Sequence, residues 1–172
     1  MKSAMFKRRP YRSFLSYIDL SREYYAAHGY TKPYKWISHQ NVPFTKLEKP
    51  LSECRVALLT TTDLEKLPGE NKQERHLSRK VVAHPVEDAP EHFYTQDLQW
   101  DRESTHTDDN DSFMPLKRLA EYAASGKIGS ASPRFYGVMT DYSQGKTSKK
   151  SAPQVLEYCK EDGVDAIILP AL

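Results

Sequence analysis

The chain has 172 residues, of which 38% are hydrophobic and 28% charged, so its length suits about one domain of the usual ~150 residues and excludes a large multidomain enzyme. Its mean hydropathy of -0.72 is low, but the chain is not as poor in apolar residues as a disordered one. The 25 basic and 23 acidic residues give a net charge of +2. This balance argues against nucleic acid as a partner, because neutralising phosphates needs a strong positive field.

The chain contains no apolar tract of the ~18 residues that would span a membrane, so we expect no membrane contact. The basic N-terminal residues are not followed by an apolar segment and a cleavage site, so we expect a solvated arm rather than a secretory signal. Cys54 and Cys159 lie far apart and form no CxxC motif. This usage argues against a disulfide framework and a zinc site, and it favours the cytoplasm.

Residues 1–50 are expected to form an N-terminal helix and an extended arm. Apolar residues recur at helical spacing from Arg12 to Tyr25, and His28-Gly29 is a plausible stop. Residues 30–50 contain three prolines together with Tyr34 and Trp36, which favours an extended segment whose aromatic side chains pack over a core. Residues 51–172 are then the main domain.

The main domain is expected to begin with a buried strand over residues 54–60, which form a short apolar run rich in β-branched residues. Residues 63–113 follow as a long polar excursion in which only residues 79–83 read as a strand. Connections of this length are uncommon in compact domains and are either functional or disordered. We therefore interpret the excursion as facing the active site or a partner.

The remaining chain alternates helix and strand. A helix is predicted from Pro115 to Gly126, followed by a strand over 134–140 and a loop of Gly, Ser and Lys over 141–151. A second helix should end at Gly163, with Val155, Leu156 and Cys159 on its inner face. A buried strand is predicted over 165–169. This order predicts an α/β fold in which a mostly parallel sheet is flanked by helices, a Rossmann-like or flavodoxin-like three-layer arrangement.

The carboxyl ends of the predicted strands should form one rim, where ligands of such sheets gather. That rim would hold Thr60, Thr61 and Thr62, the turn at Met139, and Leu172. Threonine hydroxyls and backbone amides suit a small carboxylate ligand. Threonine is also simply a good strand residue, which leaves a purely structural role open.

A polar cluster at Ser104–Asp111 contains His106, Asp108 and Asp109. A histidine beside carboxylates can exchange protons near neutrality, which makes these three residues candidates for acid–base or substrate-orienting work. A solvated loop that caps the following helix is the alternative. A metal site is disfavoured because one histidine with adjacent carboxylates is poor ligand spacing.

Several segments in this order resemble the selenoprotein B family, the substrate-processing subunits of glycine, sarcosine, betaine and D-proline reductases. They are residues 50–61, the cluster at 104–111, and residues 113–119, 124–129 and 163–170. The resemblance implies a small amino-acid substrate, a selenocysteine or cysteine nucleophile, and a pyruvoyl group on a partner subunit, with no cofactor held by this chain itself.

In that family the last segment runs directly into the nucleophile, whereas this sequence stops at Leu172. One interpretation is a chain truncated at a codon that is recoded as selenocysteine, inactive alone as a reductase. The other is a short, non-catalytic binding or regulatory homologue that acts as an interaction subunit. In a truncated chain the last strand would lack its covering helix, which would favour contact with a partner or self-association.

Overall fold

The computed structural model describes residues 16–30, 32, 42, 45–78, 80–138 and 143–170, with only the backbone described at 76–78 and 144. The chain divides into two compact units, residues 1–44 and 45–172. In the first unit, helix α1 (Tyr17–Ala27) begins at Ser16, whose hydroxyl accepts a hydrogen bond from the Asp19 amide, and ends at His28 and Gly29 as the sequence predicts. The predicted packing of Tyr34 and Trp36 lies outside the described residues.

The second unit is built on a mostly parallel sheet. Its strands are β1 (Arg55–Thr60), β2 (Val82–Pro85), β3 (Ser130–Ala131), β4 (Arg134–Gly137) and β5 (Ala166–Ile168). Strands β3 and β4 pair in parallel with the beginning and end of β1, β5 pairs in parallel with β1, and β2 pairs antiparallel with β4. β1 is therefore the central strand, and the predicted α/β class is confirmed.

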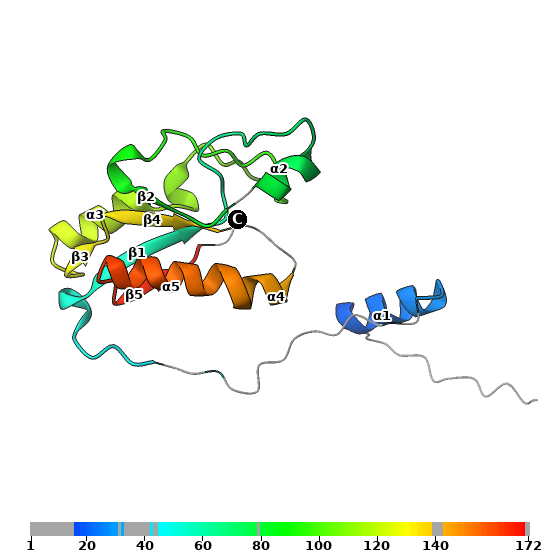
Figure 1. Cartoon of the computed structure of the whole chain (residues 1–172), viewed down its shortest axis with the longest axis horizontal. Coiled ribbons are helices and arrows are strands. Elements are labelled where there is room, and N and C mark those ends of the chain that lie inside the picture. Colours follow the sequence, from blue (N-terminus) through cyan, green and yellow to red (C-terminus); the bar gives the residue numbers. More distant parts are fainter. Residues whose placement is uncertain are drawn as a thin grey trace, which may run out of the picture. The chain divides into compact units, whose positions relative to one another are not determined.

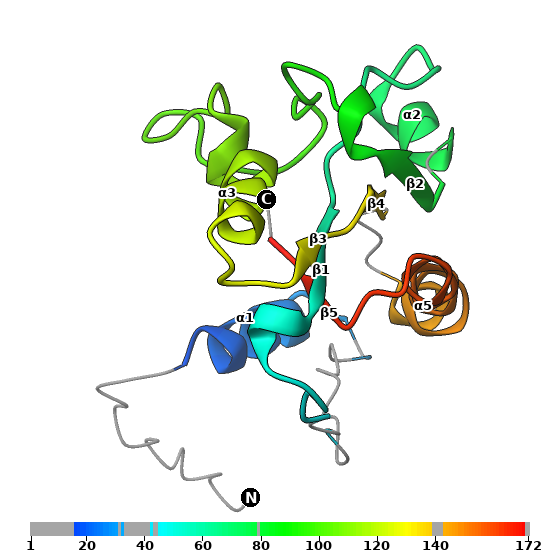
Figure 2. The same cartoon turned by 90° about the vertical axis from the view of Figure 1, so that its left-hand side faces the viewer.

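Helices α3 (Leu116–Ala124) and α5 (Ala152–Glu161) lie on opposite faces of the sheet (Figure 2). Alternate residues of a strand point to opposite faces. Val56 and Leu58 accordingly pack in the core cluster that contains Leu119 of α3, whereas Ala57 and Leu59 pack with residues of α5. This division of β1 produces the three layers that the sequence predicts.

The polar excursion between β1 and α3 contains regular structure. It includes α2 (Lys72–Ser78), β2, and two short 3-10 turns at Val86–Asp88 and Asn110–Ser112. A backbone bridge joins Asp63 to Tyr94, and the Arg75 guanidinium makes two hydrogen bonds of 2.7 Å to the carboxylate of Asp97. β2 lies slightly later than the predicted strand over 79–83, because its pairing with β4 runs from Val82 to Pro85.

The predicted loop over 141–151 is wrong for residues 144–151. There, α4 (Gln144–Lys146) and a π-helical turn (Thr147–Ser151) run into α5 as one helical rod (Figure 1). The composition is loop-like because Lys146, Lys149 and Lys150 are exposed and need no apolar face. Leu156, predicted to face inward, is 53% exposed, whereas Val155 and Cys159 are buried as expected.

β5 confirms the predicted strand, but the prediction that it is buried is wrong. Among the described strands it pairs with β1 alone. Ile168 is 47% exposed and Leu169 is 64% exposed. An edge strand whose outer side has no described partner leaves apolar side chains in contact with solvent.

Candidate functional site

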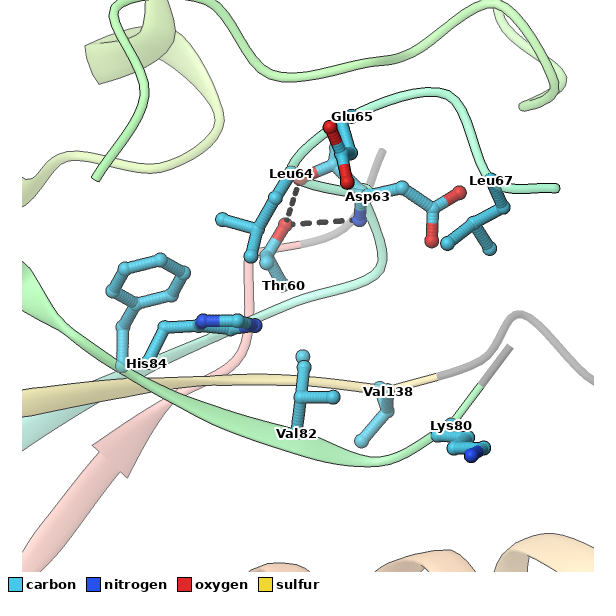
Figure 3. Close-up of a pocket in the computed structure, with 12 residues that line it drawn as sticks. Thr60, Asp63, Leu64, Glu65, Leu67, Lys80, Val82, His84 and Val138 are labelled. Carbon is cyan, nitrogen blue, oxygen red and sulfur yellow. Dashed lines mark hydrogen bonds between the residues drawn. The ribbon is translucent and has the colours of Figure 1, made fainter. Parts of the chain in front are cut away.

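A cavity of about 330 Å³ lies at the carboxyl ends of β1 and β4 (Figure 3). We call it the threonine cavity. It is lined by residues from β1, the loop that follows β1, and both strands of the β2–β4 pair: Thr60, Thr62, Asp63, Leu64, Glu65, Leu67, Lys80, Val82, His84, Phe135, Gly137 and Val138. The carboxyl edge of a parallel sheet is where ligands of such folds bind, so this cavity is the first candidate site.

Thr60 and Thr62 form a buried hydroxyl pair in the cavity wall. They are only 2% and 6% exposed. Their hydroxyl oxygens lie 2.7 Å apart, and the Thr62 amide donates to the Thr60 hydroxyl over 3.1 Å. The hydroxyl–hydroxyl bond uses one of the two hydroxyl hydrogens, so the other can be donated to a ligand. Thr61, the middle residue, does not line the cavity.

The charged lining residues of the threonine cavity come from two elements. Asp63 and Glu65 lie on the loop after β1, while Lys80 precedes β2 and His84 lies within it. Figure 3 shows the Glu65 carboxylate above Thr60, the Asp63 carboxylate to its right, and the two basic side chains along the strand below. We call Asp63 and Glu65 the acidic wall, and Lys80 and His84 the basic wall.

His84 also lines the cavity, although it is not among the site residues predicted from the sequence. In the register of the β2–β4 pair it lies opposite Phe135, and the two ring centroids are 5.8 Å apart. Burial lowers the pKa of His84, an effect that the nearby carboxylate of Asp88 partly opposes. The alternation of the strand was the available signal, because Val82 and His84 face the cavity while Val81 and Ala83 pack in the core beside α5.

Asp108 and Asp109 line a different cavity, of about 600 Å³, beside α3. We call it the acidic cavity; its lining is Val86, Ala89, Pro90, Glu91, His92, Asp108, Asp109, Asn110, Asp111, Met114, Leu116, Lys117 and Ala120. Asp109 accepts a hydrogen bond of 3.0 Å from the Asp111 amide. Asn110 donates to the carbonyls of Pro90 and Glu91. These polar groups therefore hold the loop in place.

His106 lines neither cavity. Its ring lies 3.5 Å from the carboxylate of Asp108, and both side chains are largely exposed. The structure thus brings Thr60 and Thr62 together in one cavity, with Asp108 and Asp109 in the other. The positions predicted for Met139 and Leu172 lie outside the described residues.

Neither cysteine has the surroundings of a reactive thiol. Cys54 and Cys159 are both free and buried. Burial raises the pKa of Cys159, which the hydrogen bond with Tyr136 partly offsets and the charge of Asp162 reinforces. A thiol with a raised pKa carries less of the nucleophilic thiolate. The prediction that both cysteines are buried is confirmed.

Within the described part of the chain, no group of three or more His, Cys, Asp or Glu side chains is arranged to hold a metal ion. The helices described there also include none that is long and apolar enough to cross a membrane.

A family model matches most of the chain. Residues 20–172 match the family model described as glycine/sarcosine/betaine reductase selenoprotein B. Neither the curated proteins nor the solved structures contain a significant match to the chain. The matched range covers the whole of β1, the threonine cavity and the acidic cavity.

Proposed function

Because the chain belongs to the glycine/sarcosine/betaine reductase selenoprotein B family, we propose that it is the substrate-binding subunit of an amino-acid reductase and that the threonine cavity receives the substrate. The observation that carries this proposal is the buried hydroxyl pair of Thr60 and Thr62 at the carboxyl end of the central strand. The two threonines line a cavity whose volume suits a small molecule.

A small amino-acid derivative suits the chemistry of this cavity. Glycine, sarcosine, betaine and proline each carry one carboxylate and one positively charged nitrogen. The cavity presents carboxylates, a lysine and a histidine around an otherwise apolar lining that includes Leu64, Val82 and Phe135. Such a lining offers partners for both charges, and its apolar part excludes water from the bound carbon chain.

The two thiols of the chain do not fit the redox nucleophile that the family implies, because both are buried and the pKa of Cys159 is raised. We therefore assign the nucleophile to a residue outside positions 1–172. Determining the nucleotide sequence after the Leu172 codon tests whether a selenocysteine codon follows.

In the assembled enzyme, a pyruvoyl group on a partner subunit would activate the substrate nitrogen. The part played by this chain is to bind the substrate, orient it with Thr60 and Thr62, and exclude water. We place the complex in the cytoplasm, where unpaired thiols such as Cys54 and Cys159 persist.

The acid–base role predicted for His106 with Asp108 or Asp109 is a separate proposal. These residues lie outside the lining of the threonine cavity, so the role requires that a substrate or a partner group reach the loop beside the acidic cavity. Substitution of His106 tests this role independently of substrate binding in the threonine cavity.

The test is to express the full chain with a pyruvoyl-containing reductase subunit and to measure co-elution, substrate binding and dithiol-dependent reduction of glycine, sarcosine, betaine and D-proline. We expect a complex that binds one of these substrates but shows no turnover from residues 1–172 alone. Turnover at an ordinary enzymatic rate would overturn the assignment of the nucleophile. A complex that binds no substrate would instead favour the non-catalytic interaction subunit.

A further inference from the structure

The threonine cavity has acidic side chains on one wall and basic side chains on the other. The acidic wall, Asp63 and Glu65, belongs to the loop that leaves β1. The basic wall, Lys80 and His84, belongs to β2 and the segment that leads into it. Thr60 lies between the two walls in Figure 3. A dipolar ligand that enters such a cavity has one favourable direction, because reversing it would bring like charges together.

The fold holds the two walls apart. β2 is fixed by its antiparallel register with β4, in which His84 lies opposite Phe135. The loop after β1 is fixed at its start by the hydroxyl pair of Thr60 and Thr62 and by the backbone bridge from Asp63 to Tyr94. Backbone pairing therefore fixes His84 on one wall and Asp63 on the other, and Lys80 and Glu65 lie two residues from these paired segments.

We propose that the threonine cavity binds an amino-acid zwitterion in one orientation, with its carboxylate toward Lys80 and His84 and its positively charged nitrogen toward Asp63 and Glu65. This inference rests on the proposed function and adds to it the direction of the substrate. Thr60 and Thr62, between the walls, donate their remaining hydroxyl hydrogen to the substrate carboxylate.

The protonation of His84 reports this orientation. Buried surroundings lower the pKa of His84 in the free protein, Asp88 opposes that effect, and the charges of Asp63, Glu65 and Lys80 share the cavity with it. A bound carboxylate beside the imidazole favours its charged form. Ligands with a carboxylate should therefore raise the pKa of His84, and a cationic ligand without one should lower it or leave it unchanged.

The experiment uses the full chain and three probes: glycine, acetate, which lacks the ammonium group, and glycinamide, which lacks the carboxylate. NMR titrations follow the amides of Thr62 and Gly137 for binding and the ring of His84 for its pH midpoint. We expect glycine and acetate to raise the His84 midpoint and glycinamide not to raise it. This readout needs no variant, so it does not depend on the folding of a mutant.

Variants then separate the two walls. Lys80→Met and His84→Gln should each weaken the binding of glycine and of acetate about three- to tenfold, as expected for a lost hydrogen bond between charged groups near a surface. The affinity for glycinamide should change by less than about twofold. Glu65→Gln should weaken the binding of glycine and of glycinamide but not the binding of acetate. Lys117→Met and His92→Gln, on the acidic cavity, are the matched controls and should leave all three affinities unchanged.

The outcomes separate this inference from the proposed function. Suppose that glycine shifts the amide resonances of Thr62 and Gly137, but that the basic-wall variants weaken the binding of glycinamide as strongly as that of acetate. The proposed orientation is then wrong, and the cavity remains the substrate site. A His84 midpoint that glycine does not raise overturns the orientation in the same way. If none of the three probes shifts the Thr62 and Gly137 amides, both the orientation and the use of this cavity for substrate are overturned.

Discussion

The threonine cavity and the acidic cavity contain the same kinds of side chain but use them differently. In the threonine cavity, the side chains of Thr60 and His84 project from strands whose backbone groups are already paired. In the acidic cavity, Asp109 and Asn110 bond to backbone groups of the loop around them. In the threonine cavity, one hydroxyl hydrogen of the Thr60 and Thr62 pair thus remains available to a ligand. In the acidic cavity, the side chains of Asp109 and Asn110 are used to hold their own segment.

The two cavities share one core. Phe135, 1% exposed, lines the threonine cavity, and Met114, fully buried, lines the acidic cavity. Both belong to the cluster between the sheet and α3. Truncating each side chain in turn therefore damages the same core but opens a different cavity.

The largest expected effect is that of Phe135→Ala. It should lower the free energy of unfolding by about 3–5 kcal/mol, because a fully buried aromatic side chain is lost and the core does not refill the space. Urea denaturation measures this change. Met114→Ala is the matched control, with an expected loss of about 2–5 kcal/mol. Under conditions where both variants remain folded, only Phe135→Ala should weaken glycine binding, and equal weakening by Met114→Ala would contradict the separation of the two cavities.

An intermediate effect is expected for Thr60→Val, which keeps the shape of the side chain but removes the hydroxyl. The Thr62 amide and hydroxyl then lose a partner inside the protein, which should cost about 1–3 kcal/mol of stability. Thermal and urea unfolding measure the change, together with the affinity for glycine. Thr147→Val, at an exposed position on the π-helical turn, is the control and should shift stability by less than about 0.5 kcal/mol. An unchanged glycine affinity in Thr60→Val would remove the hydroxyl pair from the site.

The smallest effect is expected for His106→Ala. The ring and the carboxylate of Asp108 are both largely exposed, so stability should change by less than about 0.5 kcal/mol and glycine binding should stay the same. Turnover in the complete reductase is the informative measurement. Lost turnover with unchanged glycine binding would support the proposed acid–base role, whereas unchanged turnover would rule it out.

Sequence patterns predicted the fold where burial dictates residue type. The apolar run of β1 and the stops at Gly126 and Gly163 were readable because a buried strand needs apolar residues and each glycine has the positive φ that ends a helix. The helix over residues 144–151 could not be predicted, because this segment is rich in exposed lysines and carries no periodic apolar signal.

The candidate site was predicted only in part for a similar reason. Thr60 and Thr62 could be placed because they follow a recognisable strand, and parallel strands end at one edge. His84 was missed although the alternation of β2 indicated which face it shares with Val82, because β2 joins the sheet in the antiparallel direction from within a polar excursion. Its pairing with β4 depends on contacts between segments about fifty residues apart, which no local pattern encodes.

The central position of β1 has a consequence for how the protein is made. Arg55, at the start of β1, bonds to Ser130 and Asp165, which lie 75 and 110 residues further along the chain. As the ribosome releases the chain, β1 emerges long before any of its described neighbours in the sheet. Contacts this distant in sequence slow folding and leave an apolar strand exposed to aggregation during synthesis. We therefore expect β1 to be the segment that most depends on chaperones in the newborn chain.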